Sequence, residues 1–244
     1  MKKTLTFITI LNFTLFSFLT SFAGNKKVQF QVLLPDGNLA WNAIISVNGQ
    51  VIGKGELKLV VPGWESLTVK VEMIGYITGY IEFNNKPGYA AIPNVFNYVL
   101  LVDDAYNESG EMLYLNRDYE IKSNKTEIES WKLIFQTVLS YFDEISVSEE
   151  KVGYIKTDWA NQNFKVGTVR TRVIVKLVSN SPLTYNIKIS SETLNRSRYI
   201  AGNNSEFDRI SIQNKDDIFV EWSRLLNKYK DFLSDLESKL ESNK

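Results

Sequence analysis

Short segments in which apolar and polar residues alternate, separated by glycine and proline, fill the first half of the chain. Residues 28–32 and 67–73 each alternate with a period of two, which is the pattern of a strand that buries one face. The Asn-Gly pair at 48–49 stands between apolar segments and is a strong hairpin signal. The Pro-Gly pair at 62–63 marks another turn. Strands this short, at this spacing, predict an all-β sandwich over residues 26–102.

Helical and strand patterns are mixed in the second half of the chain. Thr126 and Glu129 form a capping box, which predicts the start of a helix that ends near residue 142. Apolar residues at helical spacing should form its core-facing stripe: Ile128, Trp131, Phe135, Val138, Leu139 and Phe142. The strands that follow are predicted at residues 153–159, 168–178 and 183–190. A final helix is predicted over about 217–241, where apolar residues recur at steps of three and four.

This order of elements predicts a second domain with a different fold. A strand and a helix precede several antiparallel strands and a long helix, which is an α+β arrangement of the helix-grip type. This domain should cover residues 112–244. The polar, acidic residues 103–111 are predicted to be a linker. The predicted architecture is therefore two domains: an all-β sandwich, followed by an α+β helix-grip-like domain in which an antiparallel sheet lies against long helices.

The first 23 residues have the pattern of a secretory signal peptide. Two lysines at 2–3 precede an apolar core over about 5–19, and Ser21 and Ala23 are the small residues expected before a cleavage site. The core is shorter than the roughly 20 apolar residues that a membrane-spanning helix needs. We expect cleavage after Ala23, no membrane span in the mature chain, and export to the periplasm or the cell surface of a bacterium.

Cysteine and histidine are absent, and 28 Lys and Arg residues balance 28 Asp and Glu residues. Zinc sites of the Cys/His type, thiol nucleophiles and Ser-His-Asp triads are therefore excluded. The balanced charge argues against a nucleic-acid binder. The remaining enzyme class is a hydrolase with two carboxylates about 5–9.5 Å apart in a cleft, and Asp158 has no acidic neighbour on its strand face. We expect a non-catalytic protein without a metal or other cofactor.

Part of the first domain resembles the PEGA-type β-sandwich repeat. The matching residues are the strand and turn Ala43–Gln50, then Gly53, Pro62, Gly63, Val69, Val71, Gly75 and Tyr76. The chain departs from the family pattern two residues after its second glycine, where Gly55 and Glu56 replace the usual proline. The resemblance implies a small, non-catalytic accessory module of a surface or envelope protein.

The second domain resembles the C-terminal repeat domain of BamC-like outer-membrane assembly lipoproteins, over residues 112–240. The shared features are an amphipathic helix containing Trp131, the strand 153–159 (GYIKTDW), the strand containing residues 170–172 and a closing helix. Those proteins carry a lipid on a cysteine and have two such domains, whereas this chain has no cysteine and only one domain of this kind is predicted in it. The resemblance implies a helix-grip fold and an envelope location.

Strand alternation divides the side chains of the second domain between two faces. On the strand 153–159, Ile155, Thr157 and Trp159 should face the helices. The opposite, exposed face should carry these candidate partner-binding residues: Lys156, Asp158, Arg170, Arg172, Lys176 and Lys188. This face is either simply solvated or a docking surface for an acidic protein or an anionic glycan. Asp158, surrounded by cations, is expected to be an ion-pair partner rather than a catalyst.

These features favour an exported interaction or scaffold protein of the bacterial envelope, acting in outer-membrane or surface assembly with an envelope protein as its partner. One alternative is a glycan-binding surface module, in which exposed aromatic residues of the sandwich line up as a sugar platform: Trp41, Trp64, Tyr76 and Tyr80. These rings would otherwise serve core and turn packing. The other alternative is the carboxylate-based hydrolase.

Overall fold

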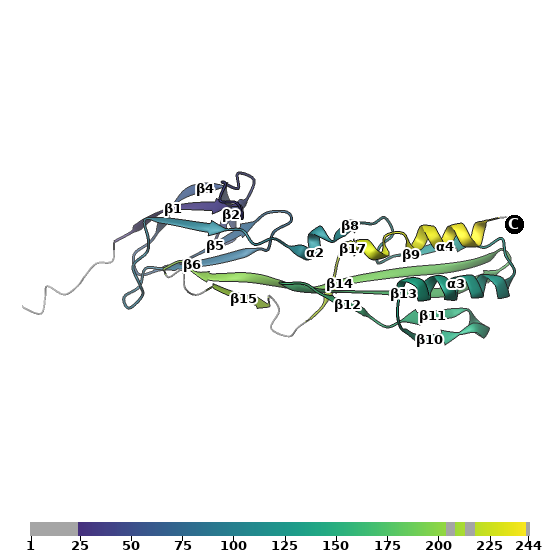
Figure 1. Ribbon diagram of the computed structural model, residues 1–244. Helices are drawn as coiled ribbons and strands as arrows, with labels where there is room; N and C mark the ends of the chain where they lie inside the picture. The colour runs from purple at the N-terminus through teal and green to yellow at the C-terminus, as the bar shows by residue number, and fades with distance from the viewer. Residues whose placement is uncertain (1–23, 204–207, 213–217, 243–244) are drawn as a thin grey trace, which may run out of the picture. The chain divides into compact units, whose positions relative to one another are not determined.

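The structure is a computed structural model that describes residues 24–203, 208–212 and 218–242 of the 244-residue chain. The backbone is mostly β-strand, arranged in several sheets (Figure 1). The β-rich character that we predicted is therefore confirmed. The predicted signal peptide, residues 1–23, lies outside the described residues. Within them, no helix is long and apolar enough to cross a membrane.

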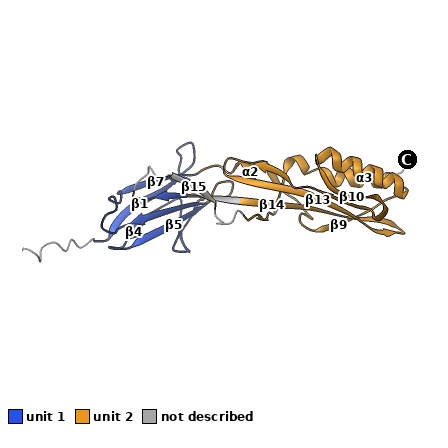
Figure 2. Cartoon of the chain, turned by 90° about the horizontal axis from the view of Figure 1, so that it is seen from below, with its two compact units in different colours: residues 1–72, 79–100, 199–209 blue, residues 73–78, 101–198, 210–244 orange. Residues whose placement is uncertain are grey.

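The chain divides into two compact units (Figure 2). Unit 1 comprises residues 1–72, 79–100 and 199–209, and unit 2 comprises residues 73–78, 101–198 and 210–244. The stretch 103–111, which we interpreted as a linker, belongs to unit 2 and forms helix α2 (Asp104–Asn107) and strand β8 (Ser109–Glu111). Asp103 caps α2, because its carboxylate accepts a hydrogen bond of 3.2 Å from the Tyr106 N–H.

Unit 1 contains two sheets. In the first, β1 is central and pairs antiparallel with β4 and parallel with β7. The second follows the order β3-β2-β5-β6, with the end of β14 beside β6. The strands are β1 (Lys26–Leu33), β2 (Ile44–Val47), β3 (Gln50–Lys54), β4 (Glu56–Val61), β5 (Ser66–Glu72), β6 (Gly79–Asn84), β7 (Val95–Val99) and β14 (Leu183–Ala201).

Aromatic rings from both sheets form the core of unit 1. Phe30 and Phe96 come from the first sheet and Phe83 from the second, and their ring centroids lie 5.2–6.2 Å apart. The predicted hairpin is confirmed, because β2 and β3 are joined by Asn48 and Gly49 alone. Both residues have positive φ angles, 48° and 85°, which is the backbone that an Asn-Gly hairpin turn requires.

Unit 2 is built on an antiparallel sheet in the order β10-β11-β13-β14-β9. β12 also pairs with β13, and β15 and β16 pair with β14. β8 forms a separate pair with β17. The strand bounds are β9 (Asp118–Lys122), β10 (Ile145–Glu149), β11 (Tyr154–Thr157), β12 (Ala160–Asn163), β13 (Gly167–Asn180), β15 (Asp208–Ile212), β16 (Val220–Glu221) and β17 (Arg224–Leu226).

Helices α3 (Glu127–Tyr141) and α4 (Phe232–Glu241) pack against the unit 2 sheet and against each other (Figure 1). Ile134 of α3, Phe232 of α4 and Val173 of β13 are completely buried members of one hydrophobic cluster. Burial of this apolar surface is the main stabilising contribution to the unit, at about 25 cal/mol per Å² removed from water.

The final helix is much shorter than the sequence suggested. We predicted a helix over residues 217–241, whose first residue lies outside the described residues, but α4 begins only at Phe232. Before it, the chain forms β16, β17 and a 3₁₀ turn at Asn227–Tyr229. Backbone groups that the helix would need are used in other pairings, because the Trp222 N–H donates to the Ser191 carbonyl (2.9 Å) and β17 pairs with β8. The prediction of a long closing helix is wrong.

Helix α3 begins where the capping box predicted. Thr126 Oγ1 accepts the Glu129 N–H (3.3 Å), and the Glu129 carboxylate accepts the Thr126 N–H (3.2 Å). The buried stripe is different from the predicted one: Ile134 is fully buried, whereas Ile128 and Leu139 are exposed. The buried face is shifted because α3 packs against α4 as well as against the sheet.

Two isoleucines on α3 provide a matched test of this packing. Ile134→Ala should lower the free energy of unfolding by about 2–5 kcal/mol, because it leaves a cavity in the core. Ile128→Ala removes the same atoms from a side chain that is 76% exposed and should change that free energy by less than about 0.5 kcal/mol. Urea unfolding followed by circular dichroism measures both. Equal effects of the two substitutions would show that α3 does not bury this face.

Candidate functional site

The outer face of the unit 2 sheet, which points away from the hydrophobic cluster, carries the cationic residues that the sequence singled out. Lys156 of β11 lies opposite Ile174 of β13, and Ile174 lies opposite Lys188 of β14. Lys176 is exposed, and Lys156 and Lys188 are half-buried. We call this surface the basic face; it comprises Lys156, Arg170, Arg172, Lys176 and Lys188.

Arg170 is engaged within the protein. Its guanidinium pairs with the carboxylate of Glu192, directly opposite on β14, with nitrogen–oxygen distances of 2.5 and 2.7 Å. The same guanidinium lies over two rings, 4.4 Å from the centroid of Trp159 and 4.0 Å from that of Phe219. Arginine is attracted to the negative faces of such rings. Arg170 therefore organises one end of the basic face, and its charge is already compensated by Glu192.

Trp159 lies on the basic face, so our prediction that it points toward the helices is wrong. The cause is a change of register. Lys156 lies opposite Ile174, which would put Ala160 opposite Arg170, but Ala160 lies opposite Thr171 instead. A shift of one residue moves every following side chain to the other face of a sheet. Ile155 and Thr157, before the shift, are buried as predicted.

Arg172 is held in place but forms no ion pair with any described residue. Its guanidinium carbon lies 4.2 Å from the centroid of the Trp159 ring. Its Nε atom is buried and has no hydrogen-bond partner among the described residues. The planar guanidinium group matches the two oxygens of a carboxylate, and no described carboxylate pairs with it. Arg172 is therefore the residue of the basic face most suited to an acceptor from outside.

Asp158 does not form the ion pair that we expected. It is exposed and follows the end of β11, and its backbone N–H donates to the Glu144 carbonyl (3.2 Å). No cation in the described part of the chain pairs with it. Glu192 provides the carboxylate instead. The sequence interpretation missed Glu192 because the predicted strand stopped at residue 190, although two more residues of alternation would have put it on this face.

An acidic edge borders the basic face. Asp118 of β9 lies opposite Lys188, and Glu120 lies opposite Asn186 of β14. Both carboxylates are exposed, and neither forms an ion pair with another described residue. The outer face therefore presents a cationic strip on β11, β13 and β14 beside an anionic strip on β9.

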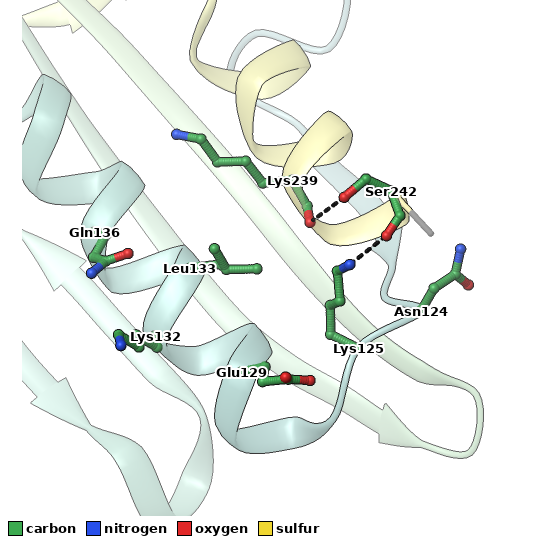
Figure 3. Close-up of a pocket in the computed structure, with 8 residues that line it drawn as sticks. All are labelled: Asn124, Lys125, Glu129, Lys132, Leu133, Gln136, Lys239 and Ser242. Atoms are coloured by element: carbon green, nitrogen blue, oxygen red, sulfur yellow. Dashed lines mark hydrogen bonds between the residues drawn. The ribbon is translucent and has the colours of Figure 1, made fainter. Parts of the chain in front are cut away.

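A groove of about 630 Å³ lies between α3 and α4 (Figure 3). Its polar groups are mostly used to hold the two helix ends together. The Lys125 ammonium donates to the Ser242 carbonyl, and Lys239 donates to Thr137 Oγ1 at 3.2 Å. Hydrogen bonds from Thr126, the backbone N–H first, lower the pKa of the Glu129 carboxyl. These contacts make the groove a structural junction.

The aromatic residues proposed as a sugar platform do not form one group. Trp41 and Trp64 are exposed in turns of unit 1, whereas Tyr76 belongs to unit 2. Tyr80 lines a groove in which its neighbours include Tyr199 and none of the other three. Sequence analysis missed Tyr199, because that residue is more than a hundred positions away in the chain.

The Arg170–Glu192 pair provides a test of how the basic face is organised. Glu192→Ala should lower the free energy of unfolding by about 1–2 kcal/mol, because the charged hydrogen bond to Arg170 is lost. The substitution also removes the repulsion between Glu192 and Glu221, which lies directly opposite on β16, and this offsets part of the loss. The exposed residue Glu120 is the control, and Glu120→Ala should have less than about 0.5 kcal/mol effect. Urea unfolding measures both, and an unchanged Glu192→Ala protein would contradict the assignment.

Comparison with models of known protein families gives no match for this chain. Comparison with curated proteins gives no match either. The resemblances to the PEGA-type repeat and to the BamC-like domain therefore stay predictions that rest on the motifs quoted above.

Proposed function

We propose that this chain is an exported, non-catalytic interaction module of the bacterial envelope, and that its basic face binds an acidic segment of an envelope protein. The observation that carries the proposal is the state of Arg172. Its guanidinium is positioned by Trp159, and no carboxylate of the described residues pairs with it. Lys156, Lys176 and Lys188 add further positive charge on one side of it, at the level of residues 174–176 of β13.

Positioning of this kind favours binding. An arginine that is already packed on a ring loses less conformational freedom when a ligand arrives than a free one does. A carboxylate of the partner would pair with the Arg172 guanidinium, which no described carboxylate engages, in a charge-assisted hydrogen bond. The three lysines would attract the partner over a longer range and raise its association rate.

The mixed charge of the outer face favours a protein over an anionic glycan. A uniformly anionic polysaccharide would meet repulsion at Asp118 and Glu120, beside the cationic strip. A protein segment can carry acidic residues opposite the lysines and basic residues opposite the β9 edge. Complementary patterns of this kind determine which partner is bound.

Two further features support the envelope location. The signal-peptide pattern of residues 1–23 predicts export. The PEGA-like motif in the first half and the BamC-like motif in the second half both suggest an envelope protein. We propose, on the same basis, that unit 1 is a PEGA-like sandwich and unit 2 a helix-grip-like domain; the packing of α3 and α4 on an antiparallel sheet supports the latter.

A double substitution tests the basic face. Arg172→Ala combined with Lys176→Ala removes the unpaired guanidinium and one exposed ammonium group, and should reduce recovery of the partner at least about tenfold, which corresponds to about 1.4 kcal/mol. Affinity purification from the envelope fraction of the source organism, followed by quantitative mass spectrometry, measures the recovery.

The control is Lys132→Ala combined with Lys151→Ala, two exposed lysines of unit 2 that lie outside the basic face. This protein loses the same net charge and should recover the partner as the unmodified protein does. Melting temperatures check that all variants are folded. Equal recovery with the Arg172/Lys176 variant and the unmodified protein would refute the proposal, as would a recovery that does not fall with added salt.

A further inference from the structure

A second candidate site lies within unit 1, on the outer face of the β3-β2-β5-β6 sheet. It is a groove of about 450 Å³, a size common among sites for small ligands. Three tyrosines line it: Tyr80 on β6, Tyr89 in the loop after β6, and Tyr199 on β14. Tyr89 and Tyr199 expose 60% and 40% of their surfaces. The groove therefore offers aromatic surface to a ligand.

Strands β5 and β6 form the floor of this groove. Thr68 on β5 lies directly opposite Glu82 on β6, and Tyr80 is two residues from Glu82, so all three share one face. The Tyr199 ring stacks against the Tyr80 ring, with centroids 4.9 Å apart and planes inclined by 10°. Burial, with a smaller contribution from Tyr80, raises the pKa of the Tyr199 hydroxyl, so this phenol is neutral at ordinary pH.

Asn203 fastens the two walls of the groove together. Its Oδ1 accepts the Asn84 N–H (2.6 Å), and its Nδ2 donates to the carbonyls of Asn84 (2.7 Å) and Ala90 (2.6 Å). Asn84 Oδ1 in turn accepts the Lys86 N–H (3.2 Å). The loop that carries Tyr89 is thereby tied to the turn after Tyr199. The groove is therefore formed before a ligand binds, which reduces the entropy cost of binding.

We propose that this tyrosine groove (Tyr80, Tyr89, Tyr199, Thr68 and Glu82) binds a neutral glycan. The C–H groups of a pyranose face carry partial positive charge and pack against the negative face of an aromatic ring. Sugar hydroxyls donate hydrogen bonds, and the exposed Glu82 carboxylate can accept two of them. No interaction of the Glu82 side chain with another described residue competes for those oxygens.

The charges of the groove favour a neutral ligand. Glu82 would repel an anionic sugar, and none of the described residues that line the groove is a lysine or arginine that could offset that repulsion. The nearest cation by register is Lys70, which lies opposite Tyr80. Its ammonium is paired with Glu72 at 2.6 Å, and that hydrogen bond raises the pKa of Lys70.

A proline-rich peptide also fits aromatic grooves, but the Glu82 carboxylate suits a sugar better. The tyrosine hydroxyls of the groove can donate to peptide carbonyls. Proline, however, lacks the N–H group from which the Glu82 carboxylate could accept a hydrogen bond. The Glu82 carboxylate is an acceptor, which matches sugar hydroxyl groups. This inference does not depend on the proposed function, because the groove lies in unit 1 and the basic face in unit 2.

Calorimetric titration of the full chain with neutral hexasaccharides tests the proposal. The probes are cellohexaose, xylohexaose, mannohexaose, maltohexaose and chitohexaose. At least one should bind. Tyr199→Ala and Glu82→Gln should each weaken that binding about tenfold or more, equivalent to about 1.4 kcal/mol. Tyr199→Phe keeps the ring and should retain most of the affinity, which keeps the test valid if Tyr199→Ala unfolds.

Two substitutions elsewhere in unit 1 serve as matched controls. Trp41→Ala removes a ring that is 67% exposed, and Glu65→Gln neutralises an exposed carboxylate; neither residue lines the groove. Both variants should bind as the unmodified protein does. The proposal is overturned if none of the five sugars binds at millimolar concentration, or if the Tyr199→Ala and Glu82→Gln proteins bind as the unmodified protein does. It is also overturned if a proline-rich decapeptide or an alginate hexasaccharide binds in place of the neutral sugars.

Discussion

The pairing of β13 with β14 is the constraint on which the rest of unit 2 depends. These two long strands pair from Gly167 opposite Asn195 to Asn180 opposite Leu183. β11 and β12 attach to β13, whereas β9 and β16 attach to β14. Because side chains alternate along a strand, one pairing determines which residues meet α3 and α4 and which form the basic face. The cationic surface is thus a direct result of the register that builds the core.

Features that depend on neighbouring residues could be predicted from the sequence, and features that depend on distant partners could not. The Asn48-Gly49 hairpin and the Thr126 capping box need only residues within three positions of each other. The direction of Trp159 depends on a register shift between β11 and β12, which no local pattern reveals. The region before Phe232 has helical spacing, but its backbone pairs with β14 and β8. Helix propensity does not determine the structure of a segment whose backbone can pair with distant strands instead.

Both candidate sites place aromatic rings beside a charged side chain that forms no ion pair with a described residue. In the basic face, Trp159 holds the Arg172 guanidinium. In the tyrosine groove, Glu82 lies beside the stacked rings of Tyr80 and Tyr199. Aromatic rings are rigid, so they hold the neighbouring charged groups in place. Long, flexible side chains in the same position would lose more conformational entropy when a ligand binds. The opposite signs of the Arg172 and Glu82 charges suit different ligands, which is why the two proposals assign an acidic protein segment to one site and a neutral glycan to the other.

Unit 1 is built from segments that are far apart in the chain, and this affects how it folds during protein synthesis. Residues 199–203, which provide Tyr199 and Asn203, come after residues 101–198 of unit 2 in the chain, although they belong to unit 1. A ribosome adding about 5–20 residues per second needs roughly 5–20 s to pass from residue 100 to this segment. During that interval β6 lacks its neighbour β14, and an open strand edge can pair with another chain. The open edge of β6 in the nascent protein therefore favours pairing with other chains until the end of β14 has been made.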